Sequence, residues 1–331
     1  MKKIFVAMLA LAAATACSND ELVSVNREAI AFDNAFINNS VRSVNDPSIT
    51  NANLQDFAVY GFVEGATLFD GTTVSKTITN SDLKSEWKYE GTQYWITGAN
   101  YNFHAVAPKT DGNWTPTAKA ADGLTLTVNN DGTTDVLYST VAQQGQLSGN
   151  PKVAFTFRHI LSKVKFSFEN AYNATNATIK VKNIKIENAY AQGSVALTST
   201  TTEWTGHNGT VVLDFGMATD AEETADKEKV EVAYAYNKTY ESQNELFLIP
   251  GAMPTDGYKV TFDVDLLVSG TSVKVFNHTV YAKFTPAVGN AYDIKAVINA
   301  ENIDPDHAQE PIEFTVNTIP GWGEATDVNA Q

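Results

Sequence analysis

The feature that most constrains this chain is the alternation of apolar and polar residues that recurs along almost its whole length. The alternation is clearest at residues 101–107, 124–128, 230–236, 258–268 and 312–316. With a period of two, successive side chains point to opposite faces of a strand, so each of these segments has one apolar face. Strands of this kind bury that face by packing two sheets together, and the Asp-Gly, Asn-Gly and Ser-Gly pairs between them are typical of hairpins. The sequence therefore predicts an all-β protein built from β-sandwiches.

The first 16 residues have the pattern of a cleaved export signal. Two lysines precede a short apolar run from Ile4 to Ala14, and small residues lead from this run to Cys17. The run is too short for a stable membrane-spanning helix, which needs roughly 20 residues. Small residues directly before a cysteine are typical of a lipobox, in which the cysteine is acylated and becomes the first residue of the mature chain. We predict a signal peptide at residues 1–16 and lipidation at Cys17, and an ordinary secretory signal cleaved near Ala16 is the alternative.

The length and the cysteine content indicate two domains without disulfides. Cys17 is the only cysteine, so the fold must be held by its cores. The mature chain has 331 − 16 = 315 residues, which at roughly 100–200 residues per domain favours two domains. A polar, glycine-containing segment from Gln143 to Pro151 separates two blocks of strand pattern. We predict a tether and first strand at residues 17–42, an N-terminal β-sandwich at 43–150 and a C-terminal β-sandwich at 151–331.

A break in the alternation is predicted just after this boundary. Val153, Phe155 and Phe157 share one parity, whereas the apolar residues from Val164 to Phe168 have the other. An unbroken strand would place one of these sets in water, so a bulge or tight bend is expected between His159 and Ser162.

Several classes of function are disfavoured by composition and motifs. The formal net charge is −15 and there is no basic stripe, which disfavours nucleic acid as a partner. No nucleophile elbow, zincin motif or phosphate-binding glycine loop occurs, and the five histidines are dispersed. The sequence thus predicts no catalytic residues, no metal and no cofactor. The best candidates for acid–base chemistry, Asp263 and Asp265, alternate with apolar residues and are expected on the exposed face of a strand. His159 is expected to be half-buried and to bond backbone at the predicted bend.

The tryptophans leave a different class of function open. Exposed aromatic side chains could form a sugar-stacking platform, although aromatic residues in sandwiches usually pack in cores. The five candidates are Trp87, Trp95, Trp114, Trp204 and Trp322.

A series of short motifs occurs in a characteristic order along the chain. They are the lipobox, Ala29-Ile30-Ala31-Phe32, Arg42-Ser43, Phe57-x-Val59-Tyr60-Gly61-Phe62, Tyr94-Trp95, Tyr101 to Pro108, Asp135-Val136-Leu137-Tyr138, Phe157-x-His159-x-Leu161-Ser162-Lys163-Val164, Leu246 to Pro250, Gly289 to Ile294, and Ile312 to Trp322. In this order and spacing the chain resembles the fimbrillins of the Bacteroidetes, the subunits of lipoprotein-derived type V pili, over nearly the whole mature chain.

The resemblance implies two tandem transthyretin-like β-sandwich domains, no catalytic activity, and assembly with other pilin subunits by strand exchange. An Arg-specific protease would cut after Arg42, and the first strand, with Ile30, Phe32, Phe36 and Ile37, would leave its groove for a strand of another subunit. Arg27 is the alternative cut, but it precedes that strand and would leave it in place. The segment from Trp322 to Gln331 is a candidate for the donated strand.

The resemblance also implies a location at the cell surface, as an outer-membrane lipoprotein and then in a fimbria that supports adhesion. The acidic residues Asp20 and Glu21, close to Cys17, resemble the signal that sends lipoproteins to the outer face of the cell. The alternative function is a glycan-binding surface lipoprotein, or a tip adhesin, that stays anchored by its lipid.

Overall fold

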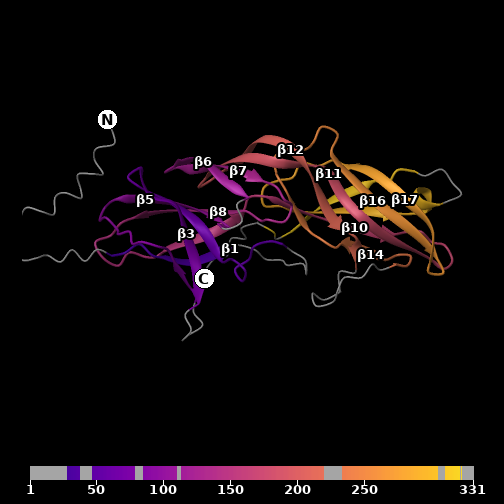
Figure 1. The fold of residues 1–331 in the computed structure, drawn as a ribbon, viewed down its shortest axis with the longest axis horizontal. Helices are drawn as coiled ribbons and strands as arrows, with labels where there is room; N and C mark the ends of the chain where they lie inside the picture. Colours follow the sequence, from indigo (N-terminus) through magenta and orange to yellow (C-terminus); the bar gives the residue numbers. More distant parts are fainter. Residues whose placement is uncertain are drawn as a thin grey trace, which may run out of the picture.

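The computed structural model describes residues 28–37, 47–78, 85–109, 113–219, 233–304, 310–320 and 322. The strands are β1 (Phe32–Ile37), β2 (Asp56–Val63), β3 (Ala66–Ile78), β4 (Ser85–Lys88), β5 (Asn100–Ala107), β6 (Trp114–Ala120), β7 (Gly123–Asn129), β8 (Leu137–Gln144), β9 (Val153–His159), β10 (Ser162–Asn170), β11 (Ala177–Thr198), β12 (Thr202–Gly216), β13 (Ala218–Thr219), β14 (Thr239–Ser242), β15 (Leu246–Leu248), β16 (Tyr258–Val268), β17 (Thr271–Ala282), β18 (Ala291–Ile298) and β19 (Phe314–Ile319), with one short helix, α2 (Ala300–Ile303). They form an elongated molecule with two lobes (Figure 1). No helix in these ranges is long and apolar enough to cross a bilayer.

The first lobe is a closed barrel with the strand order β1-β4-β3-β2-β5-β8-β9. Its interior is filled by large side chains, among them Phe57, Phe103 and Phe155, all 1% exposed or less. Gly61 lies against the rings of Phe69 and Phe103. A Cβ atom at this position would stand 2.6 Å from the Phe69 ring and 3.2 Å from the Phe103 ring. A glycine in β2 therefore lets the barrel wall approach its own core.

The second lobe consists of two sheets packed face to face. One sheet has the order β13-β14-β10-β18-β19 with β15 beside β10, and the other has the order β17-β16-β11-β7-β6 with β12 beside β11. Their facing side chains form a single core that includes Phe166, Phe168, Phe215 and Phe262. Hydrophobic burial between two sheets of alternating strands is the packing that the sequence pattern predicts.

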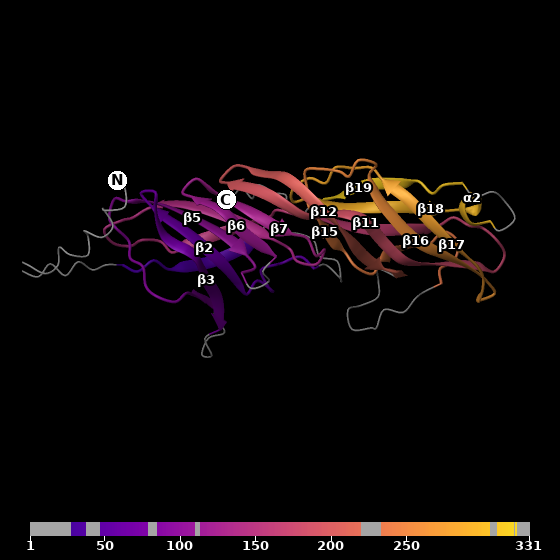
Figure 2. The ribbon, with the colours of Figure 1, turned by 45° about the horizontal axis from the view of Figure 1, so that its top comes forward.

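The two lobes share one sheet. The long strand β11 pairs with β16 in its first half and with β7 in its second half, so β6, β7 and the end of β11 lie over the outside of the barrel (Figure 2). This layer packs on the outward side chains of β2, Ala58, Tyr60 and Phe62, while Phe57 and Val59 of the same strand face the barrel interior. Both faces of β2 are thus buried, which is why its sequence is almost continuously apolar.

The prediction of an all-β protein is confirmed, whereas two tandem transthyretin-like sandwiches are not, because one sheet closes into a barrel and another spans both lobes. The predicted break after His159 is also confirmed. β9 ends at His159 in the barrel, and after a bend at Leu161 the chain continues as β10 in the second lobe. The ranges predicted as 1–16, 17–42, 43–150 and 151–331 stay a prediction, and β9, which follows residue 150, pairs with β8 and β1 of the barrel.

His104 ties the barrel to the layer that covers it. Its Nε2 lies 3.1 Å from the carbonyl oxygen of Ala121, which only accepts, so Nε2 carries the proton and Nδ1 accepts from the Tyr138 hydroxyl at 2.7 Å. Burial lowers the pKa of His104 below its usual value, against smaller opposing effects of the Ala121 carbonyl and the Asp122 charge. Burial therefore favours the neutral side chain in the folded protein.

This burial predicts a loss of stability in mild acid. Because the pKa of His104 is lower in the folded than in the unfolded chain, the unfolded chain binds more protons, and stability falls as the pH drops through the ordinary value of about 6.5. The melting temperature should therefore be lower at pH 5 than at pH 7.5, and His104→Gln should reduce this difference. Burial lowers the pKa of His278 as well, so His278→Gln should remove a further part. A difference that both variants leave unchanged would contradict this account.

Candidate functional site: the first strand and its groove

The first strand, β1, closes the barrel. It runs parallel to β9, with Phe32 opposite Val153 and Ile37 opposite Phe157, and the register shifts at a bulge between Asp33 and Phe36. On its other side, among the described residues, it pairs with β4 only at Phe32 and Trp87. Because a barrel has no free edge, removal of β1 would create two, along β9 and along β4.

Phe32, the first residue of β1, is packed among aromatic side chains of the barrel. It is 2% exposed, and Ile30 and Ile37 beside it are equally buried. Five aromatic rings surround it, with ring centroids 5.4 to 6.4 Å away: Phe57, Phe69, Tyr89, Phe103 and Phe155. β1 therefore fills an apolar groove as well as completing a set of backbone hydrogen bonds.

Polar contacts hold both ends of the strand. At its start the Glu28 carboxylate accepts hydrogen bonds from the backbone N–H and the side-chain amide of Asn150, at 2.8 and 2.9 Å, and these bonds lower the pKa of Glu28. The Tyr89 hydroxyl donates to the carbonyl oxygen of Ile30 at 2.8 Å. At its end, the Asn51 side chain accepts from the N–H of Ile37 at 2.6 Å and donates to its carbonyl oxygen at 3.3 Å.

The structure brings together the residues predicted for the departing strand. Ile30, Phe32 and Ile37 all point into the barrel core. The backbone of Phe36 pairs with Thr156, whereas its side chain lies outside the described part of the structure. Cys17, Arg42 and Arg27 also lie outside the described residues, so lipidation and cleavage stay predictions.

Trp322, the first residue of the predicted donor segment, is buried within its own chain. It is 2% exposed, its ring stacks on His159 with centroids 4.3 Å apart, and its indole N–H donates to the Ser48 hydroxyl at 2.9 Å. The Lys163 ammonium lies 5.2 Å from the ring centroid. Trp322 is thus anchored in its own chain by contacts with His159 and Ser48. Residues 323–331 lie outside the described structure.

Sequence reasoning missed the partner of His159. This residue is 1% exposed, not half-buried, and its Nδ1 lies 2.8 Å from Oδ2 of Asp135, a contact distance without hydrogen-bond alignment. The same Asp135 oxygen accepts the backbone N–H of Ile49 at 2.9 Å. Asp135 is distant in sequence and precedes an apolar run, so no local pattern pairs it with His159.

The expected exposure of Asp263 and Asp265 is wrong for Asp265, which is 7% exposed. The Ser272 hydroxyl donates to it at 2.5 Å and the Lys182 ammonium lies 3.8 Å away. Asp263 accepts from the side-chain amides of Asn183 and Asn277, at 2.7 and 2.6 Å. Both carboxylates therefore bond side chains of the neighbouring strands β11 and β17, so they tie strands together across the sheet. Within the described ranges, no three His, Cys, Asp or Glu side chains gather as a metal site would require.

The tryptophans do not form a shared surface. Trp95, Trp114, Trp204 and Trp322 are each at most 8% exposed, and only Trp87 is half-buried. The indole N–H groups of Trp114 and Trp204 donate to the carbonyl oxygens of Pro108 and Ile160, at 2.7 and 2.9 Å. They are core residues whose polar atoms are satisfied by backbone, as expected for buried indoles.

Comparison with known protein families gives the same family as the order of the sequence motifs. The family model described as fimbrillin-like matches residues 42–320, which is most of the chain. The chain belongs to the fimbrillin-like family. Membership supports a fimbrial or adhesion role at the cell surface, with other pilin subunits as assembly partners. A search of curated protein sequences finds no match.

A search of solved structures also found similar chains. A candidate cell adhesion protein of Bacteroides ovatus has 16% identity and a TM-score of 0.47, with 89% of this chain and 98% of that chain covered. A candidate cell adhesion protein of Bacteroides uniformis has 16% identity, a TM-score of 0.46 and the same coverage. A candidate adhesin of Bacteroides thetaiotaomicron has 11% identity and a TM-score of 0.39, with 82% of this chain and 90% of that chain covered.

Proposed function

We propose that this chain is a structural subunit of a cell-surface fimbria, exported as a lipoprotein through Cys17 and assembled by strand exchange. An Arg-specific protease removes the segment up to Arg42, and β1 leaves the barrel with the lipid. A strand from another subunit then enters the groove between β9 and β4. The observation that carries this proposal is the position of β1, which closes the barrel, supplies a core residue and, among the described residues, has only one pair with β4.

The free energy of burial in the groove favours replacement of β1 by another strand over an empty groove. Burial of a large apolar side chain is worth roughly 1.5–3 kcal/mol, so the three side chains Ile30, Phe32 and Ile37 together contribute about 5–9 kcal/mol. Whole domains are stable by only about 5–15 kcal/mol. An empty groove would therefore be strongly unfavourable, and a second strand that restores both burial and backbone hydrogen bonds would be bound tightly.

The groove also sets a requirement for the incoming strand. It must present apolar side chains with the spacing of Ile30, Phe32 and Ile37, and it must run parallel to β9 in the register that β1 has now. Because Trp322 is anchored inside its own chain, a donor from the C-terminus would have to consist of the residues that follow it.

Treatment of the exported protein with an Arg-specific protease tests the proposal sharply, because the chain has only three arginines: Arg27, Arg42 and Arg158. Arg158 is protected within β9, where its guanidinium donates to the carbonyl oxygen of Thr198 at 2.9 Å. We expect a product that begins at Ser43, followed by SDS-sensitive ladders or filaments.

Two glutamine variants separate the possible cuts. Arg42→Gln should prevent both the Ser43 product and assembly, whereas Arg27→Gln should prevent neither. Resistance of the protein to the protease, or assembly by Arg42→Gln at the normal rate, would refute cleavage-triggered exchange.

A further inference from the structure

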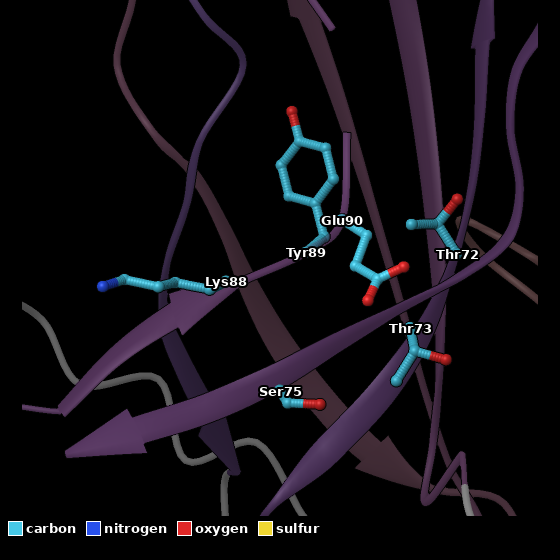
Figure 3. A pocket seen from close by; sticks show the side chains of 6 residues that line it. All are labelled: Thr72, Thr73, Ser75, Lys88, Tyr89 and Glu90. Atoms are coloured by element: carbon cyan, nitrogen blue, oxygen red, sulfur yellow. The ribbon is translucent and has the colours of Figure 1, made fainter. Parts of the chain in front are cut away.

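A polar hollow of about 570 Å³ lies in the barrel wall beside the first strand, lined by Thr72, Thr73, Ser75, Lys88, Tyr89 and Glu90 (Figure 3). It has the size of a small-molecule site, for which roughly 300–1,000 Å³ is typical. Of its lining residues only Tyr89, whose ring also contacts Phe32, belongs to the groove of β1.

The hollow exists because two strands separate. β3 and β4 pair from Ile78 and Ser85 to Ser75 and Lys88, and the same register would then place Val74 opposite Tyr89 and Thr73 opposite Glu90. Neither pair forms, although β3 continues to pair with β2. The N–H of Lys76 donates to Gln55 on the β2 side, and backbone groups alternate sides along a strand, so those of Thr73 point to the β4 side and into the gap.

The polar side chains around the hollow are available to a ligand. Among the described residues, none forms a hydrogen bond or ion pair with the side chains of Thr72, Thr73, Ser75 or Glu90. In Figure 3 the Glu90 carboxylate lies toward Thr72 and Thr73, whereas the Lys88 ammonium points away. Lys88 is paired with Glu86 at 3.1 Å. Within the described part of the chain, three hydroxyls and one carboxylate therefore remain without a protein partner around one cavity.

We propose that this hollow binds a neutral polyhydroxylated ligand, namely one or two units of a saccharide. The Glu90 carboxylate can accept hydrogen bonds from two adjacent ligand hydroxyls, and the threonine and serine hydroxyls can both donate and accept. The Tyr89 ring supplies an apolar side, because its hydroxyl is already engaged with Ile30. An anionic ligand is disfavoured, since the chain carries a net charge of −15 and Glu90 faces the cavity.

The site shares one side chain with the first strand. The Tyr89 ring lines the hollow, and it also packs 5.4 Å from the Phe32 ring. A saccharide in the hollow would hold Tyr89 in place and so strengthen the docking of β1. Saccharide binding itself does not require strand exchange, so the two proposals fail independently.

Ligand-observed saturation-transfer NMR on the uncleaved chain tests this inference. The probes are glucose, galactose, mannose, N-acetylglucosamine, lactose, maltose and cellobiose, with a sulfated heparin disaccharide as the anionic comparison. We expect at least one neutral saccharide to bind and the sulfated one not to bind. Absence of binding by every neutral probe, or binding by the sulfated one alone, would overturn the proposal.

Matched variants locate the site. Glu90→Gln and Thr73→Val should each weaken binding at least tenfold by titration calorimetry. Glu203→Gln on β12 and Thr77→Val on β3 change the same residue types outside the hollow, and they should leave the affinity within twofold. Equal affinity of all four variants and the wild type would place the saccharide elsewhere and contradict the assignment.

Discussion

Replacement of Phe32 by alanine should lower the free energy of unfolding by about 3–5 kcal/mol, the usual cost of removing a fully buried aromatic side chain. The loss should lie at the upper end of this range, because five rings around Phe32 would face a cavity that a closed barrel cannot easily collapse. Denaturant unfolding of the chain, followed by circular dichroism, measures this change.

An exposed aromatic residue of the second lobe provides the control. Tyr281 on β17 is 46% exposed, and its replacement by alanine should change stability by less than about 0.5 kcal/mol, as is usual for surface substitutions. Equal effects of the two substitutions would show that β1 is not docked as described. Phe32→Ala should also speed assembly after cleavage, because the weakened strand leaves its groove sooner.

Much of the local structure could be predicted from the sequence. The alternation of apolar and polar residues identifies strands such as β7 and β16, and the change of parity after Phe157 marks the bend through which the chain passes from the barrel into the second lobe. Ile30 and Phe32 share one parity, and both point into the barrel core. These features depend on residues close in the chain, whose side-chain directions follow from the period of a strand.

The arrangement of the strands was not predictable in the same way. The parallel pairing of β1 with β9 joins segments more than a hundred residues apart, and nothing in either segment specifies the other. The closed barrel and the sheet shared through β11 depend on such pairings, so the sequence pattern was consistent with two separate sandwiches. The environment of Asp265 could not be predicted for the same reason, because its polar partners, Ser272 of β17 and Lys182 of β11, lie on neighbouring strands.

The candidate site was predictable in part. The apolar residues of the first strand could be named, but the Asn51 contacts to Ile37 and the Glu28 contacts to Asn150 could not, since each joins residues that only the fold brings together. The role of Trp322 was the least visible. Its position near the C-terminus indicated a donated segment, whereas its contacts with His159 and Ser48 fix it within its own subunit.

A reversible covalent lock on β1 tests most directly whether this strand must leave for subunits to assemble. Asp33 and Ala154 are in register on adjacent parallel strands, which lie about 4.8 Å apart and so within the roughly 4.4–6.8 Å between Cα atoms that a disulfide spans. The double variant Asp33→Cys/Ala154→Cys, in a chain that starts at Ser18 and lacks Cys17, would be cleaved after Arg42 in the oxidised and the reduced state. We predict cleavage in both states, and filaments only after reduction. Filaments formed equally by the oxidised protein would contradict the exchange of β1.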